Sequence, residues 1–464
     1  MPQSRISLHP CKLPGGAEKA FCGAFEVFED RSANSGRKIG LNIVVLPALS
    51  SSHAPDAVFY LEGGPGGGAT EAAGAGYLEA LRKNRDIVFV DQRGAGKSNP
   101  LICDDIGENP ANLDTFFGEI FPPTLIRACR EKLESFADLK LYTTPIAMDD
   151  LDEVRDALGY DKIDIVAASY GTFAAQIYMR QHPYHVRAAF LVGVATPGFK
   201  QPLPFARAAQ NSLDLLFVDC AADQTCHGAF PHFKEEFDAV LARFGHGPVV
   251  VNMIGHNMRE SRAITLKREN YVEHLRILLY TTNSARLIPY IVHQAFQNNF
   301  VPFELAATRI NIADSIARGM YFSVTCSEGV PFISEQDIVS ETHGTFLGDA
   351  RVRAHMAACK EWPKGNVPAH FTDPLQSEIP VVIISGRVDG ATPPWIAEDA
   401  IKFLPNGRLI KIRYSGHQIV GPCVWNIMQA FIRTASVQGL DASCVEQIRR
   451  PPFATEMPKA LNRE

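Results

Sequence analysis

The sequence has 464 residues, of which 46% are hydrophobic and 21% charged, and these proportions are ordinary for a soluble globular protein. At about 150 residues per domain, the length predicts two or three domains. The net charge of −6 gives no reason to expect a nucleic-acid partner. We expect no membrane span either, because no stretch approaches the roughly 18 uninterrupted apolar residues that such a helix needs.

The first part of the chain alternates predicted strands with predicted helices. Short apolar runs between turn residues predict strands at 21–30, 38–49, 56–62, 86–91, 162–168 and 186–197. Helical spacing of apolar residues predicts one helix at 148–159, which ends in Gly159, and another from Tyr170 to just before Pro183. This alternation predicts a mainly parallel central sheet flanked by helices on both faces.

From about Phe199 the pattern becomes mainly helical. Predicted helices lie at 204–220, 230–244, 271–280 and 285–296, with one short strand pair at 248–253 and 263–266. Alternation then returns, with strands at 379–386 and 407–414 on either side of a helix around 394–404. We therefore predict an α/β core in two parts, 1–198 and 366–464, with a mainly helical domain at 199–365 inserted between them.

Ser169 is a candidate nucleophile at a strand-to-helix turn. It lies in the segment Ala-Ala-Ser-Tyr-Gly at 167–171, close to the G-x-S-x-G elbow that exposes a serine hydroxyl at a sharp, strained turn. Ala167 replaces the first glycine of that pattern, and Gly171 keeps the second. The alternative reading is a polar residue at an ordinary turn, so the motif needs a base and an acid elsewhere in the chain.

Asp389 and His417 supply those partners, since each follows a predicted strand. The carboxyl ends of parallel strands meet at one edge of a sheet, where active sites of α/β folds gather. The chain order Ser169, Asp389, His417 is the order of α/β-hydrolases. In such a triad the histidine takes the serine proton, and the aspartate fixes the imidazole tautomer. Taken alone, Asp389 would be interpreted as a turn-forming carboxylate and His417 as a surface-loop histidine.

Acyl transfer also needs two N–H donors aimed at the developing oxyanion. We predict that the backbone N–H of Tyr170, directly after the serine, is one donor. Gly64, in the glycine-rich loop "GGPGGG" after an early strand, is our candidate for the other. The alternative for that loop is a simple turn.

Other chemistries are weaker in this sequence. Residues 64–69 fit G-x-G-x-x-A with Asp91 some twenty residues later, which would be a dinucleotide fingerprint, but Pro65 interrupts it. The phosphate-loop pattern fails because Asp91 stands where "GAGKS" would need glycine. Cys226, His227 and His232 do not meet a standard zinc spacing. We expect no cofactor and no metal.

The ten cysteines are even in number and contain no C-x-x-C. Neighbours in sequence could pair, although sequence alone cannot fix connectivity. These neighbour pairs are Cys11–Cys22, Cys103–Cys129, Cys220–Cys226, Cys326–Cys359 and Cys423–Cys444. We expect disulfides formed in an oxidising compartment, the alternative being buried free thiols in the cytosol. Residues 1–10 lack the apolar core of a signal peptide, so we expect either a cytosolic protein or a secreted or periplasmic one whose signal was removed.

Several motifs together resemble the proline iminopeptidase and tripeptidyl aminopeptidase group of secreted α/β-hydrolases, over roughly residues 20–453. They are "GGPGG", "DQRGAGKS", "YTTPIAMDDLDEVRDALG", "ASYGT", "VDGATPP" and "SGHQIVGPC". The resemblance implies an α/β-hydrolase fold with an inserted helical cap. It also implies a serine exopeptidase acting at the free N-termini of peptides, with the triad and oxyanion donors at the five positions named above. Glu62, where single-residue proline iminopeptidases carry histidine, and Ala167 both favour the longer-chain branch of the group.

The resemblance also points to a residue that binds the substrate's amino group. In the group, acidic cap residues hold the N-terminal ammonium, and "TCSEGVPF" resembles its Cys-x-Glu segment and offers Glu328. The alternative for Glu328 is a solvated loop carboxylate. Close relatives include esterases, so a carboxylesterase acting on small uncharged esters competes with the peptidase. A third alternative is a nucleotide-dependent oxidoreductase or an inactive binding protein. The sequence sets no expectation for oligomeric state.

Overall fold

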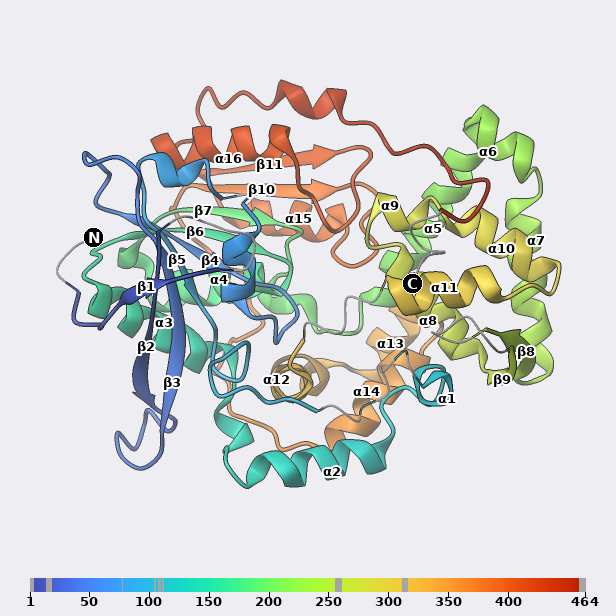
Figure 1. Cartoon of the computed structure of the whole chain (residues 1–464), viewed down its shortest axis with the longest axis horizontal. Helices are drawn as coiled ribbons and strands as arrows, with labels where there is room; N and C mark the ends of the chain where they lie inside the picture. Colours follow the sequence, from blue (N-terminus) through green and yellow to red (C-terminus); the bar gives the residue numbers. More distant parts are fainter. Residues whose placement is uncertain are drawn as a thin grey trace.

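The computed structural model describes residues 4–13, 19–76, 78–103, 106, 110, 112–254, 261–310 and 316–458. Within these residues nine strands form one sheet, in the order β1-β2-β3-β5-β4-β6-β7-β10-β11 (Figure 1). Their bounds are β1 His9–Cys11, β2 Ala20–Phe28, β3 Lys38–Leu46, β4 Ala57–Leu61, β5 Ile87–Val90, β6 Ile163–Ala168, β7 Val186–Val192, β10 Val381–Gly386 and β11 Gly407–Ile412. A separate antiparallel pair joins β8 Val249–Met253 to β9 Arg262–Leu266.

The sheet is parallel from β5 to β11, whereas β1, β2 and β3 add an antiparallel edge. This confirms the mainly parallel α/β sheet expected from the alternation of elements. The expected strands all form. Strand β1 was not expected, because its three residues show no apolar alternation; it is held by pairing with β2 and by the Cys11–Cys22 disulfide.

Alternation of side chains along the strands gives the sheet two buried faces. In β4, Phe59 and Leu61 join the cluster beneath α3, α4 and α15, whereas Val58 and Tyr60 join the cluster beneath α16. Successive strand residues point to opposite faces, so a strand apolar at every position is covered on both sides. These helices are α3 Thr144–Leu158, α4 Tyr170–Gln181, α15 Pro394–Ala400 and α16 Pro422–Thr434.

A second group of helices lies to one side of the sheet (Figure 1). Their bounds are α5 Phe205–Ala222, α6 Gln224–Ala229, α7 Phe233–Arg243, α8 Arg268–Leu278, α9 Thr282–Ala285, α10 Ile288–Phe296, α11 Val301–Arg309, α12 Arg318–Val324, α13 Glu335–Thr342 and α14 Ala350–Glu361. Two further helices, α1 Leu113–Phe116 and α2 Pro123–Glu134, come from the first part of the chain.

Most of these helices share a hydrophobic cluster of their own, but its membership crosses the expected domain boundaries. Phe116 and Phe453 join it from outside 199–365, and Met320 and Phe322 of α12 pack into the cluster of the sheet instead. The boundaries at 199 and 365 therefore stay a prediction. Within the described part of the chain, no helix is both long and apolar enough to cross a membrane.

Candidate active site

Ser169 lies between the end of β6 and the start of α4 in a strained conformation. Its φ is 53°, in the left-handed region that side chains rarely adopt. Helix α4 starts so close to β4 that a Cβ on Gly171 would lie 2.2 Å from the Leu61 carbonyl oxygen. Glycine is therefore needed at 171, whereas Ala167 fits within β6 beside Leu61. This geometry explains how the motif forms a sharp turn although its first glycine is replaced.

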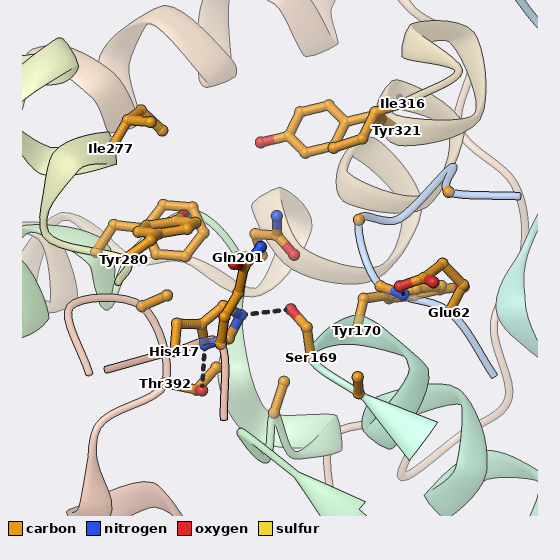
Figure 2. A pocket seen from close by; sticks show the side chains of 18 of the residues that line it. Glu62, Ser169, Tyr170, Gln201, Ile277, Tyr280, Ile316, Tyr321, Thr392 and His417 are labelled. Carbon is orange, nitrogen blue, oxygen red and sulfur yellow. Dashed lines mark hydrogen bonds between the residues drawn. The ribbon is translucent and has the colours of Figure 1, made fainter. Parts of the chain in front are cut away.

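The structure brings Ser169, His417 and Asp389 together. The Nε2 atom of His417 lies 2.8 Å from the Ser169 Oγ (Figure 2). The Nδ1 atom of His417 lies 3.0 Å from the Asp389 Oδ2. Asp389 follows β10 and His417 follows β11, so both side chains reach the serine from the carboxyl edge of the sheet. The three side chains thus have the hydrogen-bonded arrangement of a Ser-His-Asp triad.

Asp389 is fully buried and strongly hydrogen-bonded. Its Oδ1 accepts N–H groups of Ala391 and Thr392, both at 2.8 Å, and its Oδ2 accepts the Thr392 hydroxyl at 2.9 Å. Burial by itself would raise the pKa of Asp389, but the neighbouring His417 and these hydrogen bonds hold it below the usual value. Asp389 is therefore a carboxylate at neutral pH, able to fix the tautomer and stabilise the cation of His417.

Two residues around His417 were not predicted. The Thr392 hydroxyl lies 3.1 Å from His417 Nδ1 as well as bonding Asp389. Tyr280, from the turn after α8, accepts the His417 backbone N–H on its carbonyl at 2.6 Å and places its ring 5.3 Å from the imidazole. The position of Thr392, three residues after an aspartate at a turn, could have indicated a side-chain contact. Nothing in the sequence near Tyr280 indicates its place beside the histidine.

The glycine loop after β4 lies against the serine. A Cβ on Gly63 would lie 3.0 Å from the Ser169 Cβ, and Gly64 lines the same cavity as Ser169 and Tyr170. The Gly63 N–H already donates to Glu62 Oε1 at 2.7 Å. Gly64 is therefore the better donor candidate in the loop, alongside Tyr170, whose N–H opens α4 and has no partner within that helix.

Glu328 is buried, so the reading as a solvated loop carboxylate is wrong. It lies in a π-helical turn, Thr325–Gly329, and lines the cavity with Ser169. One carboxylate oxygen accepts the Thr144 N–H at 2.5 Å, and the other accepts the Thr144 hydroxyl at 2.6 Å. That hydroxyl lies 2.7 Å from the Tyr170 hydroxyl. Burial raises the pKa of Glu328 to about 8, with the hydrogen bonds from Thr144 opposing the rise.

The cavity around these residues has a volume of about 650 Å³. Its walls come from the sheet edge and from the second group of helices, with many aromatic and aliphatic side chains. A site of this size accommodates a small organic molecule or a short peptide segment. A further carboxyl group, Glu62, is half-buried near Tyr170 (Figure 2), and its partial burial raises its pKa.

The residues that suggested other chemistries have structural partners. Asp91 is fully buried and accepts hydrogen bonds from the Thr70 N–H and hydroxyl, at 2.8 and 2.9 Å, so it cannot also bind a ribose. Cys226 pairs with Cys220, which removes its sulfur as a metal ligand. Among the described residues, the group that could hold a metal is Asp152 with His182 and His185. Asp152 is already bound by Arg155 and Tyr178.

All ten cysteines lie in described residues and form disulfides between neighbours in sequence, with no free thiol. The pairs are Cys11–Cys22, Cys103–Cys129, Cys220–Cys226, Cys326–Cys359 and Cys423–Cys444. The connectivity is therefore the one that joins each cysteine to the nearest cysteine in the sequence.

Comparison with known protein families agrees with this fold. Residues 56–217 match a family described as alpha/beta hydrolase fold, and residues 345–444 match one described as TAP-like protein. The chain has the α/β-hydrolase fold, and its similarity to known hydrolases shows a hydrolase enzyme.

Among known proteins it is similar to peptidases. Serine protease Hip1 of Mycobacterium tuberculosis is 24% identical over 490 aligned residues, covering 95% of this chain and 89% of that protein. Tripeptidyl aminopeptidase of Streptomyces lividans is 31% identical over 193 residues, 38% of this chain and 35% of that protein. Proline iminopeptidase of Aeromonas sobria is 20% identical over 205 residues, 44% of this chain and 38% of that protein. The resemblance to the proline iminopeptidase and tripeptidyl aminopeptidase group is thereby confirmed.

Proposed function

We propose that this chain is a serine exopeptidase that cleaves amide bonds near the free N-terminus of peptides, of the prolyl or tripeptidyl aminopeptidase type. The observation that carries the proposal is the hydrogen-bonded series Ser169, His417, Asp389, with distances of 2.8 and 3.0 Å. These relatives are named as peptidases, which supports amide bonds rather than ester bonds as the bonds that are cleaved.

Each residue of the site has its own role in the proposed reaction. His417 Nε2 takes the Ser169 proton as Oγ attacks the scissile carbonyl, and Asp389 stabilises the resulting imidazolium. The N–H groups of Tyr170 and Gly64 bind the oxyanion of the tetrahedral intermediate. Collapse breaks the amide bond, His417 gives its proton to the leaving amine, and an acyl-enzyme remains. Water activated by His417 then hydrolyses the ester and restores Ser169.

Glu328 is our candidate for the residue that binds the substrate's ammonium group. It is buried in the wall of the cavity on the Tyr170 side of the serine, where an ammonium would otherwise lose its hydration without compensation. A bound cation favours the ionised carboxyl group, so substrate binding should draw a proton off Glu328 near neutral pH. An N-blocked peptide has no such cation, and the proposal therefore predicts discrimination against it.

A carboxylesterase is the second candidate. Both Glu328 oxygens already accept hydrogen bonds from Thr144, and the cavity wall is largely apolar. Such a site could equally take an uncharged acyl or alcohol group, with the same triad performing the chemistry.

A substrate panel separates the two candidates. It contains aminoacyl and tripeptidyl amides with free N-termini, their N-acetylated counterparts and small neutral esters, each tested on the wild type and on Ser169→Ala. The proposal expects hydrolysis of free-amine amides well above the acetylated ones. Activity confined to the esters would replace the peptidase by the esterase. Mapping a fluorophosphonate adduct to a residue other than Ser169 would refute the triad.

Calorimetry tests the role of Glu328 directly. Titration with a free-amine product, in buffers of different ionisation heat at pH 7, should detect a proton released on binding. The Glu328→Gln variant should release none. Release that persists in this variant would assign the titrating group elsewhere.

We further propose that the protein works in a secreted or periplasmic location. Its five disulfides support this, since disulfides persist in oxidising compartments and are rare in the cytosol. Finding the native protein with alkylatable thiols would favour a cytoplasmic location instead.

A further inference from the structure

Arginines gather where the second group of helices lines the cavity. Arg276 of α8, Arg318 of α12 and Arg351 of α14 line it, and so does the carboxylate of Glu273 in α8. Glu273 is shared between two of them. Its Oε1 accepts Arg276 Nη2 at 2.5 Å and also accepts Arg351 Nη1. Two positively charged guanidinium groups therefore share the single negative charge of Glu273.

Among the described residues, Glu273 is the carboxylate that forms ion pairs with Arg276 and Arg351. Arg351 Nη2 donates to the Tyr321 hydroxyl at 3.2 Å, and within the described residues its buried Nε–H has no hydrogen-bond partner. Arg318 lies 5.7 Å from the centre of the Tyr321 ring. Figure 2 shows the Tyr321 hydroxyl directed into the pocket. A buried charge is costly unless it is compensated, so this end of the cavity is suited to an anion.

Arg276 lies on the histidine side of the serine, and Arg351 is joined to it through Glu273. Figure 2 shows Ser169 with His417 and Tyr280 on one side and Tyr170 on the other. The Arg276 guanidinium donates to the Tyr280 hydroxyl at 2.5 Å and lies 5.1 Å from the centre of that ring, which is itself 5.3 Å from the imidazole. Since an extended residue spans about 3.5 Å, Arg276 lies within about three residues of the His417 imidazole.

The direction of proton transfer decides which part of the substrate reaches this end. His417 gives its proton to the leaving amine, so the leaving part of the substrate passes on the His417 side. The acyl part, with the N-terminal ammonium, then lies on the side of Tyr170 and Glu328. The cavity is thus acidic at one end and basic at the other.

We propose that Arg276 and Arg351 form a subsite for a carboxylate of the leaving group, an assignment that rests on the proposed exopeptidase function. The planar guanidinium matches a carboxylate with two parallel hydrogen bonds. The favoured substrates are then short peptides whose free C-terminal carboxylate lies two or three residues beyond the cleaved bond. An acidic side chain at the same distance is the other source of this group.

A purely structural role for the arginines is the alternative, and the sheet domain offers a matched control. There Arg93 donates to Asp150 at 2.6 and 2.9 Å, and Arg31 donates to the same carboxylate at 2.9 Å. This trio has the same composition but does not line the cavity. Arg31→Met therefore removes one cation from an equivalent trio without touching the proposed subsite.

The experiment measures binding of the leaving product rather than turnover. Calorimetry compares Ala-Ala with its C-terminal amide on wild type, Arg351→Met, Arg351→Lys and Arg31→Met. Ala-Ala should bind at least about tenfold more tightly than the amide to wild type and Arg31→Met, the difference expected for charge-assisted hydrogen bonds. The preference should vanish in Arg351→Met and survive in part in Arg351→Lys.

Two further ligands identify the source of the carboxylate. Ala-Glu amide that binds better than Ala-Gln amide would show that an acidic side chain is accepted, whereas equal binding of those two would restrict the subsite to a C-terminus. Equal binding of Ala-Ala and its amide to wild type, together with equal binding of the second pair, would overturn the subsite. A preference that persists in Arg351→Met would overturn the assignment to Arg351.

The binding experiment can be interpreted whatever the substrate panel shows. Binding needs no turnover, so an enzyme that hydrolyses only esters would refute the exopeptidase while leaving the carboxylate preference measurable. Folding of Arg351→Met is expected to survive, because Glu273 keeps Arg276 as a one-to-one partner. A melting temperature measured alongside checks this.

Discussion

At the scale of single residues, Ser169 combines a reactive position with a strained backbone. Replacing it by alanine removes the attacking oxygen but leaves the φ of 53° to be adopted by a residue of similar preference. We expect Ser169→Ala to lower kcat/KM by at least about a thousandfold, with little change in melting temperature. A small ester serves as substrate. Activity within tenfold of the wild type would contradict the assignment of the nucleophile.

Thr392 is expected to act by positioning Asp389 and His417. In Thr392→Val, which keeps the shape of the side chain, the hydroxyl donor to Asp389 Oδ2 is lost while the backbone N–H contact to Oδ1 remains. The loss of one hydrogen bond to a charged group should lower kcat by about tenfold and leave KM nearly unchanged. Thr392→Ser should restore most of the rate. Equal rates for the valine variant and wild type would show that the hydroxyl has no role.

Glu328 predicts a dependence of stability on pH. Its pKa is 4.5 in its ordinary state and about 8 in the fold because of burial, so the folded state binds a proton that the unfolded state has released between these values. The cost of ionising buried Glu328 is absent below about pH 4.5, grows up to about pH 8 and is then constant at about 5 kcal/mol.

Glu328→Gln removes this penalty. Its melting temperature relative to wild type should therefore rise steadily from pH 5 to pH 8 and level off above. A scan of both proteins by calorimetry over that range is the measurement. A difference that stays constant with pH would show that Glu328 is not buried in its neutral form.

At the scale of elements, the junction of β4, β6 and α4 depends on glycine at 171. A Cβ there would lie 2.2 Å from the Leu61 carbonyl oxygen, a backbone atom that cannot move without shifting β4. Gly171→Ala should lower the free energy of unfolding by about 2 kcal/mol or more, measured by urea denaturation. Gly228→Ala in α6, where the added methyl meets nothing within 4 Å, is the control and should be neutral or slightly stabilising. Equal effects of the two would contradict the close approach.

The same elements show what the sequence could predict. The strands were foreseen because apolar runs such as 56–62 must be buried on both faces, and the turn at Ser169 because small residues flank it. The π-helical turn at Thr325–Gly329 was not foreseen, because an i to i+5 bonding pattern has no sequence signature. For that reason the burial of Glu328 and its contact with Thr144 became visible only in the structure.

At the scale of the whole molecule, the meeting of Ser169, Asp389 and His417 could be predicted and their surroundings could not. Ser169, Asp389 and His417 follow strands of one parallel sheet, so their meeting is a consequence of topology. Tyr280, Arg276 and Arg351 belong to the second group of helices or to a turn beside them. Their place over the site depends on how those helices dock on the sheet, a long-range packing result that no local pattern encodes.

One disulfide joins two segments that carry the proposed substrate-binding residues. Cys326, two residues before Glu328, pairs with Cys359 of α14, the helix that also carries Arg351. The pair thus joins the acidic and basic ends of the cavity through one covalent link. A cross-link over a loop of this length stabilises a fold by about 3 to 4 kcal/mol, mainly by restricting the unfolded chain.

Removing this disulfide should therefore impair substrate binding more than the rate of the chemical step. In the double variant Cys326→Ala with Cys359→Ala we expect a clearly lower melting temperature and a higher KM for free-amine peptide amides, because the segments that hold Glu328 and Arg351 loosen together. Hydrolysis of a small neutral ester should change little, since the triad is held by the sheet. The matching double variant of Cys11 and Cys22, which joins β1 to β2, should lose stability without this change in KM. Equal KM values for the two double variants would show that the link between α14 and the Glu328 turn supports the fold alone.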